Sequence, residues 1–413
     1  MQILTINPGG NSVKAQLIEC EPHQQHAFQG KKLFSITIED IGKDPSLFGA
    51  IGLSTGSVTI EREKVEAAGY ADAALRFFDW YRRSADKLPP LGSIDSVAVR
   101  VVHGGEFFDK PALFTDEVAR TIEELEKLAP LHNKSSLEVL NPLREAFGAQ
   151  PIFAVFDSAF HRSIPEHAYR YGIPLELADK HGIRRYGFHG ISHRYQLERY
   201  AWLNNKNSSA CNIVTTHLES GCSVTAIREG KSIDNTMGLT PLEGLMMGTR
   251  SGDIDPTVID LLMREEKLKI DEIMTLLNKK SGLLGVSGKS LDTRVLMKDY
   301  DSGGRARLAM DIFAYRLRKA IGAMAAAIGD VEVIIFSGGI GEDTPMVRAA
   351  ACEGLSGFGL KLDPEANRAR INEEGKITAS ESRLPAWVII AEEGLEMAHE
   401  CLQQLRPYPS SMQ

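Results

Sequence analysis

The sequence has no long apolar run and few cysteines. A helix needs about 20 apolar residues to cross a bilayer, and no stretch of this chain approaches that length, so we expect no membrane partner. The amino terminus reads directly into a strand and lacks the basic and apolar regions of a secretory signal. The five cysteines show no Cys-x-x-Cys spacing, which argues against a disulfide framework or a zinc site and predicts a cytoplasmic location.

The chain also lacks the basic balance of a nucleic-acid-binding protein. It carries 47 Lys and Arg against 55 Asp and Glu, a net charge of −8, so we expect no nucleic-acid partner. With 413 residues, 43% of them hydrophobic, it is long enough for two domains with separate cores.

Strands and helices alternate along the chain, which is typical of an α/β fold. Apolar runs predict strands at residues 2–6, 13–18, 94–102, 151–156, 212–216, 223–228, 331–336 and 387–390. Helical spacing of apolar residues predicts helices near residues 71–87, 116–128, 135–147, 256–265, 270–280 and 304–328, with a terminal helix that ends near 405. Several strands end in polar residues, so the pattern indicates a functional site at the strand ends.

The second half begins with a near-repeat of the first. Residues 3–19 and 212–228 both read as an apolar strand, a polar turn with glycine, the pair Ser-Val and a second strand. The repeat predicts two domains of related fold, although two hairpins can also resemble each other by chance. No low-complexity linker separates the halves.

Residues 237–256 combine glycines, prolines and apolar residues around a single arginine, Arg250. Such a stretch makes a poor helix and a poor strand, and its apolar content argues against a solvated loop. A buried arginine needs an anionic partner. The segment therefore predicts either a cleft wall whose arginine binds an anionic ligand or an internal pair with Asp253 or Asp255.

Glycine-bearing turns follow three of the predicted strands, at residues 7–12, 217–222 and 337–342. Bare backbone N–H groups in such turns can approach a phosphate closely, so the three turns together predict a nucleotide site. A P-loop is disfavoured, because the glycine required before Gly288 and Lys289 falls at Leu283.

Carboxylates follow two of the predicted strands. Asp157 could hold Mg²⁺ directly or through water, or it could cap the next helix. Glu392 and Glu393 show the same ambiguity. Because adjacent residues point in different directions, we expect at most one of these two glutamates to reach a metal.

Several histidines lie near glycines and loops: His103, His132, His189, His193 and His217. Their spacing matches no zinc pattern, and each could be a hydrogen-bonded structural residue. The segment 184–189 is more suggestive, because it brings an aromatic ring and an imidazole to one turn.

The most specific motifs run in one order along nearly the whole chain: RVVHGGE at 100–106, LAPLHN at 128–133, VFDSAFH at 155–161, YGFHGISH at 186–193, the segment 237–256, and GGIGE at 338–342. Together they closely resemble the acetate kinase family, within the superfamily that also holds sugar kinases, actin and heat-shock ATPases. The resemblance implies an α/β protein with two facing ribonuclease H-like (actin-like ATPase) domains and a nucleotide cleft between them. The first domain would hold residues 1–160 plus 386–413, and the second, nucleotide-binding and dimerising domain residues 161–385, in a homodimer.

The resemblance further implies a phosphotransferase with a carboxyl acceptor. The γ-phosphoryl group of ATP would pass to acetate or another short-chain carboxylate, giving an acyl phosphate and ADP, with Mg²⁺ or Mn²⁺ as cofactor. A carboxylate is already ionised at pH 7. Catalysis then depends on positioning and charge stabilisation rather than on a strong base.

By the same resemblance, the site residues fall into four groups. The implied catalytic residues are Arg100, Asp157, His189 and Arg250. The acid would bind to Arg100, Val102, Leu131, Phe188 and Pro241, where Val102 favours acetate over longer acids. The nucleotide would bind to Lys14, His217, Gly221, Asp292, Arg294, Gly338, Gly339 and Gly341. The metal would be held by Asn7 and Glu392.

The chain departs from the family pattern in its phosphate-side turns. Glu219 and Ser220 stand where the family has Gly-Asn. An extra carboxylate beside ATP phosphates should weaken nucleotide binding unless it points away or meets the metal. Two alternatives therefore stay open: a related propionate or butyrate kinase or one that uses another phosphoryl donor, and a catalytically degraded nucleotide-binding regulatory protein.

Overall fold

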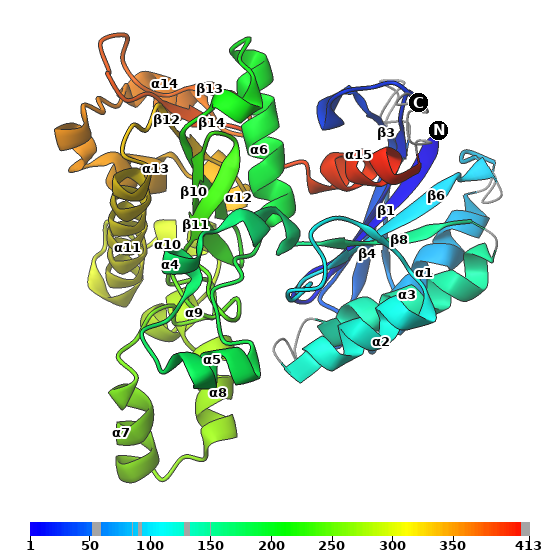
Figure 1. Cartoon of the computed structure of the whole chain (residues 1–413), viewed down its shortest axis with the longest axis horizontal. Coiled ribbons are helices and arrows are strands. Elements are labelled where there is room, and N and C mark those ends of the chain that lie inside the picture. The colour runs from blue at the N-terminus through cyan, green and yellow to red at the C-terminus, as the bar shows by residue number, and fades with distance from the viewer. Residues whose placement is uncertain (52–58, 85, 90–92, 128–132, 149, 406–413) are drawn as a thin grey trace. The chain divides into compact units, whose positions relative to one another are not determined.

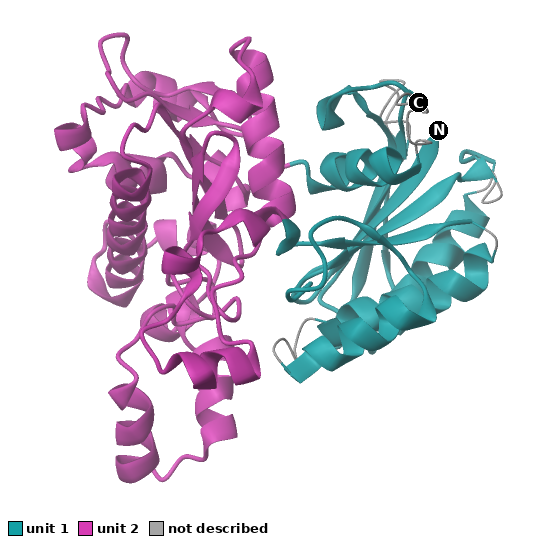
Figure 2. Ribbon diagram, in the orientation of Figure 1, with its two compact units in different colours: residues 1–159, 392–413 teal, residues 160–391 magenta. Residues whose placement is uncertain are grey.

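The chain divides into two compact units in the computed structural model (Figures 1 and 2). The structure describes residues 1–51, 59–84, 86–89, 93–127, 133–148 and 150–405. Unit 1 comprises residues 1–159 and 392–413, and unit 2 comprises residues 160–391. The sequence placed the second boundary after residue 385. It lies after Ala391 instead, because β14 (Ala386–Val388) pairs with strands of unit 2.

Unit 1 is built on a mixed sheet with the strand order β5-β4-β3-β2-β1-β6-β8-β7. Its strands are β1 (Gln2–Pro8), β2 (Val13–Glu19), β3 (Lys31–Glu39), β4 (Ser46–Ile51), β5 (Thr59–Lys64), β6 (Ser96–Val101), β7 (Ala112–Leu113) and β8 (Ile152–Phe156). β1 pairs antiparallel with β2 and parallel with β6, and β6 pairs parallel with β8. The carboxyl ends of β1, β6 and β8 therefore lie at the same end of the sheet.

Helices cover both faces of this sheet. α1 (Tyr70–Arg83) and α3 (Asn133–Phe147) pack on one face, and α15 (Glu393–Leu405) packs on the other (Figure 1). α2 (Asp116–Glu124) packs on α3. Burial on both faces explains why β1 reads as a continuous apolar run rather than as an alternation.

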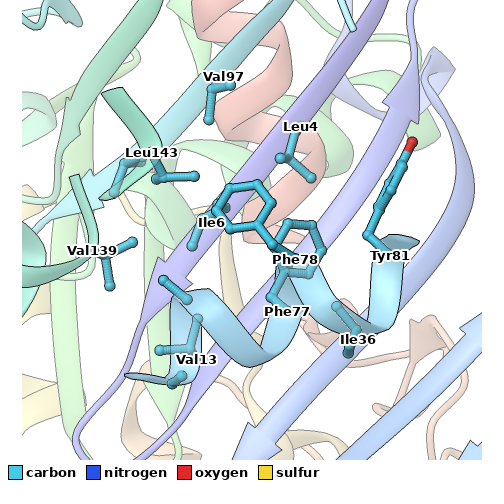
Figure 3. Packing of buried hydrophobic residues seen from close by; sticks show 14 of the residues in the cluster. Leu4, Ile6, Val13, Ile36, Phe77, Phe78, Tyr81, Val97, Val139 and Leu143 are labelled. Atoms are coloured by element: carbon cyan, nitrogen blue, oxygen red, sulfur yellow. The ribbon is translucent and has the colours of Figure 1, made fainter. Parts of the chain in front are cut away.

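The core of unit 1 lies between the sheet and α1. Leu4 and Ile6 of β1 meet Phe77 and Phe78 of α1 there (Figure 3). Each of these side chains is at most 2% exposed, and full burial of such a side chain contributes roughly 1.5–3 kcal/mol. This packing fixes β1, and with it the polar residues that follow the strand.

Unit 2 repeats the central strand order of unit 1. Its sheet has the order β11-β10-β9-β12-β14-β13. The strands are β9 (Ile213–Leu218), β10 (Cys222–Arg228), β11 (Lys231–Asn235), β12 (Val333–Phe336), β13 (Gly375–Lys376) and β14. β9 pairs antiparallel with β10 and parallel with β12, as β1 does with β2 and β6. The series β11-β10-β9-β12-β14 thus corresponds to β3-β2-β1-β6-β8, and the predicted α/β fold with a repeated architecture is confirmed.

Two long helices flank the sheet of unit 2. α11 (Gly304–Ile328) packs against β9, β10 and β11, and α6 (Gly190–Leu203) packs against β9 on the other side (Figure 1). The remaining helices are α4 (Glu166–Tyr169), α5 (Leu175–His181), α7 (Thr257–Glu265), α8 (Ile270–Lys279), α9 (Gly282–Ser287), α10 (Thr293–Met297), α12 (Gly339–Asp343), α13 (Pro345–Cys352) and α14 (Pro364–Ala369). In the described part of the chain, no helix combines the length and the apolar character that a bilayer span requires.

The elements with a clear apolar period were predicted best. The helix expected at 304–328 is α11, and residues 237–256 form neither a helix nor a strand, as expected. β3 was not predicted, although its residues Phe34, Ile36 and Ile38 alternate as buried positions of a strand should. α6 was also missed, because buried residues lie around its whole circumference and leave no single apolar stripe.

Candidate active site

Three polar residues meet at the carboxyl ends of β1, β6 and β8 in unit 1. Arg100 donates hydrogen bonds to Asn7 Oδ1 at 3.0 Å and to Asp157 Oδ2 at 2.5 Å. Asp157 is fully buried, whereas the Arg100 side chain keeps 12% of its surface exposed. The parallel pairing of the three strands brings these residues together from positions far apart in the sequence.

The carboxylate of Asp157 has one oxygen that the protein does not use. Its partner is the Arg100 guanidinium at Oδ2, so it does not cap the following turn. In the part of the chain that the structure describes, Oδ1 is buried without a hydrogen-bond donor. Buried carboxylate oxygens are normally satisfied, and a cation or its bound water would satisfy this one.

The two glutamates at the start of α15 have different partners. Glu393 Oε2 accepts a hydrogen bond from Asn7 Nδ2 at 2.8 Å, whereas Glu392 pairs with Lys32 Nζ at 2.5 Å. The sequence selected Glu392 for the metal beside Asn7, but the structure brings Glu393 to Asn7. Lys14, a predicted nucleotide ligand, lies directly opposite Asn7 in the β1–β2 ladder and is exposed.

The described residues contain no preformed cage of acidic or imidazole side chains. Among the described residues, no three His, Cys, Asp or Glu side chains gather closely enough to hold a metal by themselves. Mg²⁺ commonly takes one or two carboxylates and completes its shell with water and phosphate oxygens. The cluster around Asp157 fits that mode of binding rather than a closed protein site.

In unit 2, His189 and Arg250 both lie close to Gly221. A Cβ atom placed at Gly221 would be 3.3 Å from Arg250 Nη1 and 3.3 Å from His189 Nε2. Gly221 belongs to the turn between β9 and β10, and His189 precedes α6. His189 has φ of 59°, a left-handed conformation that is uncommon for a residue with a side chain and recurs at functional sites.

Arg250 is held by neutral groups of its own segment. It donates to Pro241 O at 3.1 Å and contacts Met247 Sδ at 3.6 Å. The two aspartates that the sequence offered as partners have other donors. Asp253 accepts from Gly244 N, and Asp255 accepts from Thr257. The binding of an anionic ligand by Arg250 stays a prediction.

The turn at residues 337–342 packs backbone against backbone on the end of β9. Gly338 has φ of 77°, and a Cβ there would lie 2.7 Å from Leu218 N. Leu218 N donates to Ser337 O at 2.9 Å, and Gly338 N donates to Glu342 Oε1 at 2.8 Å. Only glycine fits this position. Burial raises the pKa of Glu342 to about 7, and the charge of Glu219 adds to this rise.

A hollow of about 220 Å³ lies beside this turn in unit 2. Its lining includes three predicted nucleotide ligands, Gly339, Asp292 and Arg294. The structure adds residues that the sequence did not assign to a nucleotide ligand set: Glu219, Ser220, Leu291, Thr293, Ile340 and Asp343. Asp292 and Arg294 form an ion pair at 2.9 Å. Because Glu219 and Asp343 add two more acidic side chains, the lining is negative overall.

The remaining predicted residues lie at the ends of buried elements. Val102, 6% exposed, follows β6 in unit 1, and the fully buried Phe188 and the buried Pro241 belong to unit 2. His217 is 4% exposed, and its Nδ1 lies 2.8 Å from Ser192 Oγ. Leu131, predicted in the acid pocket, lies outside the described residues.

The repeated strand order, with charged and glycine-bearing segments at its strand ends, defines the chain as an α/β protein of two related units. The chain belongs to the acetokinase family, whose sequence model matches residues 2–399.

Known relatives cover the chain almost completely. A protein of Solibacter usitatus named acetate kinase is 41% identical and aligns over 99% of this chain and 100% of its own length. The crystal structure of Porphyromonas gingivalis acetate kinase is 35% identical, with a TM-score of 0.87 and coverage of 98% of this chain and 100% of that one. A propionate kinase from Francisella tularensis is 34% identical, with a TM-score of 0.85 over 97% and 98% of the two chains.

Proposed function

We propose that this chain transfers the γ-phosphoryl group of ATP reversibly to acetate, giving acetyl phosphate and ADP. The observation that carries the proposal is the pair of His189 and Arg250 around Gly221, beside which an added methyl group would already be crowded. Membership of the acetokinase family supports the same reaction. A positively charged guanidinium and an imidazole that both lie close to one glycine can stabilise the charge of a phosphoryl group during its transfer.

The reaction forms one bond and breaks one bond. An oxygen of the acetate carboxylate attacks the γ-phosphorus, and the bond between that phosphorus and the β,γ-bridging oxygen breaks, so ADP leaves with the electron pair. Arg250 neutralises the charge that spreads over the γ-phosphoryl oxygens, and His189 donates to one of them. Arg100 binds the carboxylate and reduces its repulsion with ATP.

Mg²⁺ is the metal that we propose to accompany ATP. The buried Asp157 Oδ1, which has no donor among the described residues, supports its binding in unit 1. Asp157 and Asn7, together with Glu393 or Glu392, would hold the ion directly or through water. When bound, it would neutralise phosphate charge. Arg100 would keep the Asp157 carboxylate in place through the hydrogen bond at Oδ2.

The test is a matrix of acids and phosphoryl donors. The purified chain is incubated with acetate, propionate or butyrate, with ATP or pyrophosphate and with Mg²⁺, and acyl phosphate is trapped as the hydroxamate with hydroxylamine. We expect the highest turnover with acetate and ATP. Absence of hydroxamate with every acid and donor would refute the proposal and favour a regulatory nucleotide-binding protein.

Propionate is the second candidate substrate. The likeness to the propionate kinase of Francisella tularensis favours it. Val102 still favours acetate, although one methylene changes discrimination by only about 1–3 kcal/mol. A higher kcat/KM for propionate than for acetate in the same matrix would select this alternative. The homodimer and the cytoplasmic location also stay predictions, and light scattering of the purified chain would test the first.

A further inference from the structure

A row of hydrogen-bonding side chains leads from His189 into the interior of unit 2. His189 Nδ1 lies 2.8 Å from Ser223 Oγ, and Ser223 Oγ lies 2.8 Å from His193 Nε2. His193 Nδ1 lies 2.7 Å from Thr215 Oγ1. Ser223, His193 and Thr215 are all fully buried. The far end of the row, His189 Nε2, is the atom that lies against Gly221 beside Arg250.

Burial favours the neutral form of the inner histidine, His193. Burial lowers the pKa of His193 well below its ordinary value, and His161 and His217 lower it further. A neutral imidazole has one N–H donor and one acceptor nitrogen. The two ring nitrogens of His193 therefore play opposite roles towards Ser223 and Thr215, and the role of one fixes the role of the other.

When each hydroxyl group of the row donates to one neighbour or accepts from it, and Ser223 does one on each side, two directions of hydrogen bonding result. In the first, Thr215 donates to His193 Nδ1, His193 Nε2 donates to Ser223, and Ser223 donates to His189 Nδ1. In the second, each donor and acceptor is exchanged, and His189 Nδ1 donates to Ser223. The first direction places the proton of a neutral His189 on Nε2, and the second suits a His189 that carries protons on both nitrogens.

We propose that Ser223, His193 and Thr215 form a reversible hydrogen-bonded chain that keeps a proton on His189 Nε2 in both charge states of His189. They are positioning residues, because they act through His189 and not on the phosphoryl group. The proposal rests on the proposed function, in which Nε2 donates to the γ-phosphoryl group. When His189 gains a proton, each shared proton moves one position along the row: from Thr215 to His193 Nδ1, from His193 Nε2 to Ser223 and from Ser223 to His189 Nδ1. One proton from solvent restores the Thr215 hydroxyl group, and the backbone does not move.

Two further histidines and Arg250 lie beside this row of side chains. The ring of His217, from β9, lies 4.3 Å from the ring of His189, and the Arg250 guanidinium lies beyond Gly221. The ring of His161 lies 5.8 Å from that of His193. His217 Nδ1 contacts Ser192 and His161 Nδ1 contacts Ser232, so each of these histidines has hydroxyl partners of its own.

The test is the tautomer of His193 as His189 titrates. The intact protein is labelled with ¹⁵N-histidine, and two-bond ¹⁵N–¹H spectra are recorded from about pH 5 to about pH 9, which spans the ordinary imidazole pKa. His189→Asn and His193→Gln assign the signals. We expect His193 to carry its proton on Nδ1 while His189 is charged and on Nε2 once His189 is neutral. The same tautomer of His193 on both sides of the titration would overturn the proposal.

Matched variants distinguish the loss of a hydrogen bond in the row from a change in packing. Ser223→Ala and Thr215→Val remove a hydroxyl group, whereas Thr215→Ser keeps it. We expect Ser223→Ala to abolish the coupled tautomer change and to lower kcat about tenfold, the effect of one lost hydrogen bond of about 1.4 kcal/mol, with KM for acetate nearly unchanged. Thr215→Val should follow it, and Thr215→Ser should behave as the wild type. Wild-type kcat in folded Ser223→Ala, or in Thr215→Val if Ser223→Ala does not fold, would overturn the proposal.

The spectra test the hydrogen-bonded row and the kinetics test the proposed function, so either proposal can be refuted without the other. If the wild type forms no acyl phosphate, the proposed function is wrong. The spectra still show whether the hydrogen-bonded row of Ser223, His193 and Thr215 changes direction. If the wild type is active and His193 does not change its tautomer, the proposal about the hydrogen-bonded row is wrong and the proposed function stands.

Discussion

Replacing Gly221 by alanine should slow phosphoryl transfer without unfolding the protein. The new Cβ atom would lie 3.3 Å from Arg250 Nη1 and from two atoms of the His189 ring. Contacts of this length are tighter than nine in ten real Cβ contacts, so one or both side chains must move by a few tenths of an ångström. The substitution therefore acts on the two groups that the proposed mechanism needs most.

The expected loss follows from the cost of misplacement. A displacement of about 1 Å in an active site can cost about 10²-fold in rate, so a shift of a few tenths should lower kcat about threefold to tenfold. The assay is the initial rate of hydroxamate formation at saturating acetate and MgATP. Gly322→Ala in α11 is the matched control, because its Cβ would meet no atom within 4 Å. It should keep wild-type kcat and slightly raise helix stability.

Thermal unfolding separates a displaced site from a damaged fold. Gly221 is not among the glycines with positive φ, so alanine strains no backbone angle there. We expect the melting temperature of Gly221→Ala to stay close to that of the wild type. A wild-type kcat in a folded Gly221→Ala protein would refute the reasoning, because it would show that His189 and Arg250 need not keep their present positions.

Three further outcomes are expected. Arg250→Ala or Arg100→Ala should lower turnover about 10²–10⁴-fold in steady-state kinetics through lost charge stabilisation, and wild-type-like turnover would remove that arginine from the mechanism. Glu219→Gly should tighten ATP binding in calorimetry, about fivefold if it relieves about 1 kcal/mol of repulsion. Unchanged or weaker binding would show that the carboxylate points away or helps to hold metal. Burial raises the pKa of Glu342 from 4.5 to about 7, so the free energy of unfolding should fall as the pH rises through this range, by up to about 3 kcal/mol. Glu342→Gln should remove this fall in denaturant titrations, and an equal fall in the variant would assign it to another group.

Local patterns predicted the elements and the type of chemistry well. β1 and β9 stand out because both are continuously buried, and the turns after them contain glycine because backbone groups approach closely there. Arg250 stood out because a lone arginine in an apolar, helix-breaking segment needs an anionic partner, either a ligand or a carboxylate of the protein. Such signals depend on neighbours within a few residues, so one sequence suffices to find them.

The sequence alone could not choose between Glu392 and Glu393. Both are adjacent carboxylates with the same local signals, and only the docking of α15 on the sheet brings Glu393 to Asn7 and leaves Glu392 with Lys32. The same limit applies to Ser223, which reads as an ordinary strand residue until α6 packs on β9 and places it between His189 and His193.

The sequence by itself determined the α/β class, the repeat of one strand–turn–strand pattern and, through the family resemblance, the residue types that phosphoryl transfer needs, because apolar period, glycine and charge act over short distances along the chain. Tertiary structure decided which of those residues are partners. Strand pairing and helix docking join positions hundreds of residues apart, and the direction of each side chain is fixed only when these elements pack.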